Sequence, residues 1–200
     1  MINELLPFLS ILNPFALCLY LSDTAHELGL RAYVRTIGVA SLISYATFLV
    51  FALGGRPLLV KTLHIQPEAM RLFGGIIFLV IAHDYVMKGY RATAELRGRL
   101  HLPSAVALPY MIGAGTITQS ILIGEHLTLS ATILTLFFGV VTAFVVLLLF
   151  KIAGDQLKKR REDIMNRYLD LFARLNALVI GAISTQMIMS GVRTLWEHYG

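Results

Sequence analysis

Charged residues are scarce in this chain of 200 residues. Asp, Glu, Lys and Arg make up 14% of it, whereas a typical soluble domain contains about 25%. The deficit extends along the whole sequence, and no stretch is long and polar enough to form a separate soluble domain. The composition therefore excludes a soluble protein with one membrane anchor. It predicts a single membrane-embedded domain over residues 1–200.

Cysteine and membrane histidine are also nearly absent. Cys18 is the only cysteine, which excludes an internal disulfide and a thiol relay that needs a pair. Only His83 among the histidines falls within an apolar run, so the facing histidines of a b-type haem site are missing. Residues 188–191 read Ile-Met-Ser-Gly, which is not the Gly-x-Ser-Gly of a rhomboid-like protease. We expect no enzymatic activity, no cofactor and no metal site.

Apolar residues are abundant, and they gather into runs near the length that crosses a bilayer, about 20 residues. The first run lacks the basic start and the small-residue cleavage site of a signal peptide, so we expect it to be retained as a span. The sequence predicts an all-α membrane protein with six transmembrane helices, at residues 2–21, 34–53, 69–86, 104–123, 129–152 and 172–195.

Lysine and arginine are distributed unevenly among the segments between these runs. Of the 17 basic residues, 13 lie between, or at the facing ends of, the first and second, third and fourth, or fifth and sixth runs, and 4 lie on the other side. Basic residues are retained in the cytoplasm, so both termini are expected on the non-cytoplasmic side. The basic run 158–161 is interpreted as a topology anchor that contacts anionic lipid. The net charge of +5 then has a membrane explanation, and no nucleic-acid partner is expected.

The two halves of the chain resemble each other. A shift of 102 positions places residues 6–8 (Leu-Pro-Phe) on 108–110 (Leu-Pro-Tyr) and residues 87–91 on 189–193. Each half holds three spans, so the second half enters the membrane in the opposite direction. The sequence thus predicts two inverted three-helix repeats, about 1–91 and 104–200, as in secondary transporters.

Helix-breaking residues occur near the middle of the first and fourth spans, which are partners in the repeat. Asn13-Pro14 suits an N-cap and the first residue of a new half-helix. Gly113-Ala114-Gly115-Thr116 permits an interruption, and Thr116 or Thr118 could cap the restart. Two half-helix N-termini at the membrane centre would bind a carboxylate. The alternative is that each break serves only helix packing. We predict a substrate site at Asn13, Pro14, Phe15, Gly113, Ala114, Gly115, Thr116 and Thr118.

Other polar residues in the spans have two interpretations. Gln119, Thr185 and Gln186 are candidates for lining a polar cavity. Arg71 and Asp84 are candidates for the same cavity or for proton coupling, but each also fits a charge that reaches the membrane interface.

These motifs resemble those of the MarC/SnatA family of six-span membrane proteins. The family pattern Asn-Pro-x-Gly-x-x-Pro corresponds to residues 13–19, Arg-x-x-Gly-Gly to 71–75, and Ala-Gly-Pro-Gly-x-x-Thr to 112–118. In the sixth span, Arg-x-Met-Gly corresponds to 174–177, followed by Gln186-Met187 and Gly191. The resemblance implies an inner-membrane protein that transports small neutral amino acids such as glycine and alanine, and an oligomer is compatible with it.

Three of the positions that depart from the family pattern lie at the predicted helix breaks. The glycine of the first motif is Ala16, its second proline is Leu19, and the proline of the fourth-span motif is Ala114. Softer helix breaks and a differently shaped pocket are therefore expected. The alternative function is a non-transporting membrane component, such as a scaffold or a stress-related protein built on the same fold.

Overall fold

The computed structural model describes residues 1–62, 64–88, 111–158 and 162–199, and every regular element in those ranges is a helix. The first part of the predicted fourth span, residues 104–110, and residues 159–161 of the basic run lie outside the described residues. The elements are α1 (Ile2–Leu12), α2 (Pro14–Tyr20), α3 (Ser22–Glu27), α4 (Leu30–Arg56), the π-helix η1 (Pro57–Thr62), α5 (Pro67–Lys88), α7 (Ala114–His126), α8 (Leu129–Lys158) and α9 (Glu162–Tyr199).

Four of these helices contain segments long and apolar enough to cross a membrane: Leu30–Gly55, Pro67–Lys88, Leu129–Gln156 and Arg174–Glu197. They correspond to the second, third, fifth and sixth predicted spans. The helices extend beyond the predicted runs because helical hydrogen bonding continues past the point where apolar residues stop. With 38 residues, α9 is about 57 Å long, well beyond the thickness of the hydrocarbon core.

The two remaining predicted spans are not continuous helices in the described residues. The first run is divided into α1, α2 and α3, of which Ile2–Cys18 forms a shorter apolar segment. The fourth run is represented by the 13 residues of α7, which reach only about 20 Å. The predicted break at Asn13 thus falls between α1 and α2, and Gly113 directly precedes α7. Most of the half-helix expected before Gly113 lies outside the described residues.

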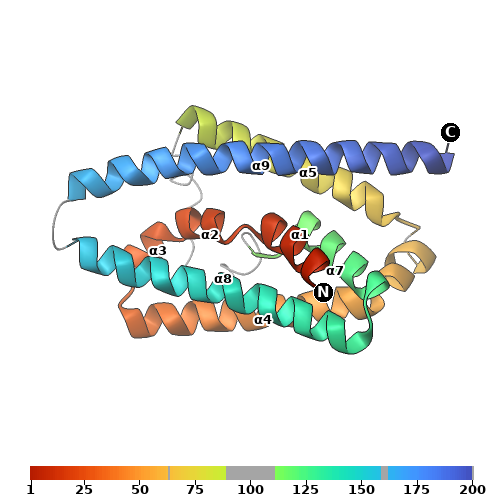
Figure 1. The fold of residues 1–200 in the computed structure, drawn as a ribbon, viewed down its shortest axis with the longest axis horizontal. Helices are drawn as coiled ribbons and strands as arrows, with labels where there is room; N and C mark the ends of the chain where they lie inside the picture. The colour runs from red at the N-terminus through yellow and green to blue at the C-terminus, as the bar shows by residue number, and fades with distance from the viewer. Residues whose placement is uncertain (63, 89–110, 159–161, 200) are drawn as a thin grey trace.

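These short helices lie between two pairs of long ones. Figure 1 shows α5 beside α9 on one side, α4 and α8 on the other, and α1, α2 and α7 in the layer between them. The C-terminus and η1 lie at one end of the molecule, and the N-terminus and the end of α7 lie towards the same end. We call this the terminal end. The opposite end, formed by α3, the start of α4 and the end of α8, is the α3 end.

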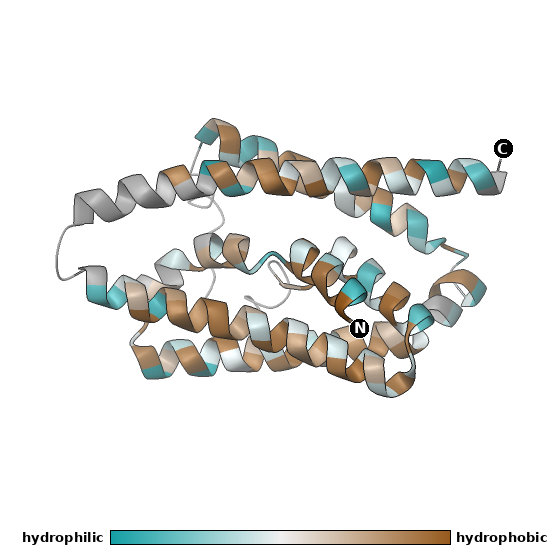
Figure 2. Ribbon diagram, viewed as in Figure 1, coloured by the Kyte–Doolittle hydropathy of each residue, from teal (hydrophilic) through white to brown (hydrophobic). Residues whose placement is uncertain are grey.

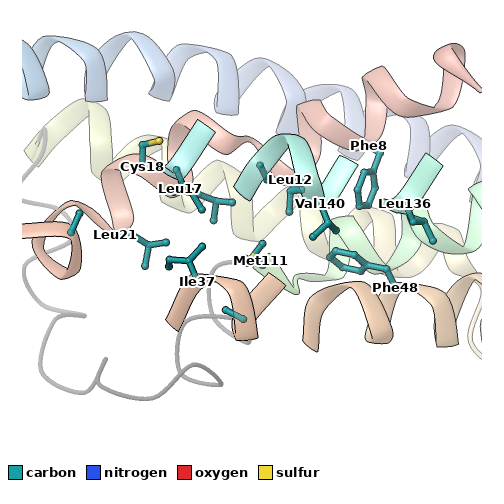
Figure 3. Packing of buried hydrophobic residues seen from close by; sticks show 14 of the residues in the cluster. Phe8, Leu12, Leu17, Cys18, Leu21, Ile37, Phe48, Met111, Leu136 and Val140 are labelled. Carbon is teal, nitrogen blue, oxygen red and sulfur yellow. The ribbon is translucent and has the colours of Figure 1, made fainter. Parts of the chain in front are cut away.

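Apolar packing between α1, α2, α4 and α8 forms the main core. The rings of Phe8 and Phe48 meet edge to face, with their centroids 5.3 Å apart. A Cβ at Gly139 would lie 2.6 Å from the Phe8 ring, so the glycine makes room for that ring. Figure 3 shows the aliphatic residues between the helices, including Leu12, Leu17, Leu21, Ile37, Leu136 and Val140.

The α5/α9 pair packs through small residues. A Cβ at Gly75 would lie 3.0 Å from the carbonyl oxygen of Ser184, and one at Gly191 would lie 3.1 Å from that of Glu68. Such close backbone approach is typical of helix pairs in membranes, where small residues replace the hydrophobic effect as the source of tight packing.

Large apolar side chains cover the outer surface of the long helices, and hydrophobic residues dominate α4 and α8 in Figure 2. A soluble monomer rarely exposes contiguous apolar surface of this extent, so the outer surface suits lipid. Examples that are at least half exposed are Leu42, Val50, Leu53, Phe73, Val80, Leu149, Leu178 and Val179.

Candidate substrate site

Asn13 separates α1 from α2 and has a left-handed backbone, with φ 44° and ψ 77°. Its amide donates to the carbonyl of Leu9 at 2.8 Å, which closes α1. Its side-chain Oδ1 accepts a hydrogen bond from the amide of Ala16 at 3.1 Å, which caps α2. Asparagine tolerates the left-handed region, and the residue before a proline avoids the helical region. The interruption that the sequence predicted therefore occurs at Asn13, with Pro14 as the first residue of α2.

The start of α7 is capped by its own threonine. Gly113 has an extended backbone, with φ −120° and ψ 168°, and α7 begins at Ala114. The Oγ1 of Thr116 accepts from the Gly113 amide at 2.9 Å and lies 3.1 Å from the Met111 carbonyl, to which it donates. Thr118 instead donates within the helix, to the Ala114 carbonyl at 2.8 Å. Of the two threonines that the sequence offered as caps, Thr116 is the one that caps the start of α7.

The two helix starts belong to one packed region. A Cβ at Gly115 would lie 3.0 Å from Ile11 Cγ2, two residues before Asn13. A Cβ at Gly74 would lie 2.9 Å from the backbone nitrogen of Gly115 and 3.3 Å from the Ala114 carbonyl carbon. The first turn of α7 thus lies against α1 on one side and against Gly74 of α5 on another.

Asn176 of α9 is a polar residue of this region that the sequence analysis missed. Its Oδ1 accepts a hydrogen bond from Asn13 Nδ2 at 3.2 Å. Its Nδ2 is buried and has no hydrogen-bond partner among the described residues. The residue as a whole is 7% exposed. An unpaired buried donor is costly and usually has a specific role. The available signal was an asparagine inside an apolar span, at the position where the family pattern has methionine.

The space beside Asn13 is small in this conformation. It is a cavity of about 30 Å³. Pro14 is buried, whereas Phe15 is 55% exposed and turns outward. The cavity is lined by Ser10, Ile11, Leu12, Asn13, Ala16, Tyr20, Phe78, Ile180 and Ile183.

A larger cleft of about 430 Å³ opens towards the terminal end and shares Ser10, Ile11 and Ile183 with the small cavity. It includes three of the residues predicted to line a polar cavity, Arg71, Gln119 and Gln186. The other lining residues are Asn3, Glu4, Pro7, Leu122, His126, Met187 and Ser190. The two spaces therefore adjoin along these three shared residues.

The other two residues considered for the cavity lie elsewhere. The hydroxyl of Thr185 is on the exposed side of α9 and donates to the Gly181 carbonyl at 2.9 Å. Asp84 is near the end of α5, where its carboxylate is 3.7 Å from Lys88 Nζ and 3.7 Å from His83 Nδ1. These contacts are compatible with the interpretation of Asp84 as a charge at the membrane interface, which stays a prediction.

Lys151 joins α3 to α8 at the α3 end. The sequence analysis counted this residue only among the basic residues that set the membrane orientation. Lys151 is buried within α8, with 3% of its surface exposed. Its ammonium donates to the carbonyl oxygen of Ala25 in α3 and to Asp155 Oδ1, the latter at 2.7 Å. Cations stabilise helix C-termini, so Lys151 fastens the end of the first interrupted span to α8.

Groups of three or more histidine, cysteine or acidic side chains that could hold a metal do not occur in the part of the chain that the structure describes.

Comparison with known proteins agrees with the family resemblance of the sequence motifs. The model of the MarC family of integral membrane proteins matches residues 1–196. A UPF0056 membrane protein of Aquifex aeolicus (strain VF5) is 25% identical over 213 residues, covering 98% of this chain and 94% of its own length. A UPF0056 membrane protein of Pyrococcus horikoshii is 26% identical over 194 residues, covering 95% and 92%. No solved structure matches the chain.

Proposed function

The chain belongs to the MarC family of integral membrane proteins, and from this we propose that it is a secondary transporter of small neutral amino acids such as glycine and alanine. The observation that carries the proposal is the interruption at Asn13, because the turn of α1 that precedes it packs through Ile11 against Gly115 in the first turn of α7. Transport through such a site needs no covalent chemistry and no cofactor.

The chemistry of the two helix starts suits a carboxylate. The first turn of a helix has amides without intrahelical partners and the positive end of the helix dipole. The first turn of α7 supplies the backbone amides of Ala114 and Gly115. Neither residue has a side chain larger than a methyl group. The unpaired Nδ2 of Asn176 supplies another donor beside Asn13. A bound carboxylate would satisfy that donor.

The proposed architecture is six spans arranged as two inverted repeats, about 1–91 and 104–200. The packing supports it: α1 contacts α7, α4 contacts α8 and α5 contacts α9, and the crossed pairs α1/α8 and α4/α7 also pack together. The restart points at Asn13 and Gly113 are 100 positions apart, close to the shift of 102 that aligned the two halves. We place the protein in the inner membrane, with both termini and therefore the terminal end on the non-cytoplasmic side.

In this arrangement the conformation is open towards the non-cytoplasmic side. The cleft of about 430 Å³ reaches the terminal end, whereas Lys151 holds α3 against α8 at the other end. The cavity of about 30 Å³ beside Asn13 is far smaller than the usual small-molecule site of about 300–1,000 Å³. Entry of substrate therefore requires α1 and α7 to separate, and release to the cytoplasm requires the Lys151 contacts to break.

The test is uptake of radiolabelled glycine, alanine and a panel of larger amino acids into proteoliposomes, with and without a proton or sodium gradient. Gradient-dependent uptake of a small neutral amino acid is the expected result. Asn13→Ala should reduce its apparent affinity by up to about thirtyfold, because an N-cap contributes about 0.5–2 kcal/mol.

Thr142→Ala is the matched control, because Thr142 also lies in a membrane helix but bonds only to the Phe138 carbonyl of its own helix. Equal uptake by Asn13→Ala and Thr142→Ala would remove Asn13 from the substrate site. Failure to transport any member of the panel under either gradient would favour the alternative, a non-transporting membrane component.

A further inference from the structure

The cleft at the terminal end has two oppositely charged side chains on different walls. Arg71 of α5 and Ser190 of α9 belong to one wall, and Glu4 of α1 with Gln119 and His126 of α7 belongs to the other. The cleft lies within the size range of small-molecule sites, about 300–1,000 Å³.

Arg71 is positioned but has no counter-ion among the described residues. Its Nη1 donates to Ser190 Oγ at 2.9 Å, and no described carboxylate forms an ion pair with it. A guanidinium has five N–H donors in a planar fork that matches a carboxylate. The Ser190 contact fixes the direction of the fork and leaves other donors for a ligand.

Glu4 is held in a comparable way by neighbours from α7. Its Oε1 lies 3.0 Å from His126 Nδ1, and its Oε2 accepts from Gln119 Nε2 at 3.4 Å. Its side chain is only 21% exposed, and no lysine or arginine of the described ranges pairs with it. Each oxygen of the carboxylate has a lone pair for a further donor.

We propose that this cleft is a second binding site, which holds a small zwitterionic amino acid before it reaches Asn13. The ligand carboxylate binds Arg71, and its ammonium group binds Glu4. Opposite charges on separate walls suit a zwitterion, because a simple anion or cation would satisfy only one of them. The walls next to these charges are apolar (Ile11, Leu122 and Met187), which fits a small aliphatic side chain.

This inference rests on the proposed function for the class of ligand, but it concerns a different site. The helix-break site uses backbone amides around a cavity that is closed in this conformation, whereas the cleft uses charged side chains and is already open. The residues common to both spaces, Ser10, Ile11 and Ile183, mark the boundary that the ligand would cross.

The test is equilibrium binding of radiolabelled glycine to the purified full chain in detergent, with the stoichiometry measured for wild type and variants. Wild type should bind two glycine molecules per chain. Arg71→Gln and Glu4→Gln should each weaken one of them by about tenfold or more, since a hydrogen bond to a charged group is lost. Asn13→Ala should weaken the other. The matched controls are Arg193→Gln and Glu197→Gln, a surface pair on the same end of α9.

A measurement on wild type alone keeps the inference testable if a variant misfolds. Acetate and methylammonium each engage one charge, so each should displace glycine from the cleft far less well than alanine does. Binding of one glycine that only Asn13→Ala weakens would overturn the second site and leave the proposed function standing. Equal displacement by acetate and alanine, or no binding of glycine and alanine, would also overturn it. The proteoliposome assay then decides the proposed function separately.

Discussion

Gly74→Ala adds one methyl group at the point where α5 meets the first turn of α7. The new Cβ would lie 2.9 Å from the Gly115 nitrogen and 3.3 Å from the Ala114 carbonyl carbon. Both are backbone atoms, so no side-chain rotation can relieve the contact. Either α5 or the start of α7 must move.

Two effects of opposite sign determine the change in stability. Replacing glycine by alanine inside a helix is worth about 1 kcal/mol in favour of the folded state. Overpacking a close contact costs about 1–3 kcal/mol. Because backbone atoms cannot give way cheaply, the overpacking should dominate, and Gly74→Ala should lower the free energy of unfolding by up to about 2 kcal/mol. The same displacement moves the amides of α7 that we assign to the substrate carboxylate, so alanine binding should weaken as well.

Gly154→Ala provides the matched control, because a Cβ at that helical position has no atom within 4 Å. The free energy of unfolding of Gly154→Ala should be about 1 kcal/mol higher than that of wild type, and the variant should bind alanine as wild type does. The measurements are equilibrium unfolding of the purified protein in mixed detergent and thermal stabilisation by added alanine. If Gly74→Ala is as stable as Gly154→Ala and is stabilised equally by alanine, the contact between Gly74 and the start of α7 has no role in stability or binding.

Three further outcomes are expected. Gly115→Val should abolish stabilisation by alanine, because its side chain would extend from 3.0 Å contacts with Ile11 and Met187; retained stabilisation would exclude the first turn of α7 from the site. Asn176→Leu should leave stability within about 1 kcal/mol of wild type, because removing an unpaired donor offsets the lost bond to Asn13, while uptake in proteoliposomes falls; unchanged uptake would assign the residue to packing. Lys61→Cys should react with an impermeant maleimide in intact cells and Glu27→Cys only after permeabilisation; the reverse pattern would invert the proposed orientation.

The sequence predicted the long helices well because their signal is local. Runs of apolar residues mark α4, α5, α8 and the second part of α9, and the structure has candidate spans in each. The interruption at Asn13 was also predictable, since a proline cannot continue a helix smoothly and asparagine tolerates the conformation that the break requires. Such effects act within a few residues of the chain.

The contacts that complete the candidate site could not be predicted in this way. Asn176 meets Asn13 across 163 positions of sequence, and the polar cleft joins residues of α1, α5, α7 and α9. Lys151 looked like a loop charge because hydropathy does not reveal that α3 ends beside α8. Each of these depends on how the helices pack, which no local pattern specifies.

The departures from the family pattern change the pocket more than the break. Asn13 is the residue of the break that has a left-handed backbone, and its Oδ1 accepts a hydrogen bond from the amide of Ala16. Any residue except proline at position 16 would supply that backbone amide. Leucine at position 19 lets α2 continue to Tyr20. Alanine at position 16, however, is buried and packs with Ala82 and Ile180, where glycine would leave a methyl-sized space. The methyl group lines the cavity of about 30 Å³, so a sharp break and a narrow pocket coexist, and we expect the proposed site to favour the smallest amino acids.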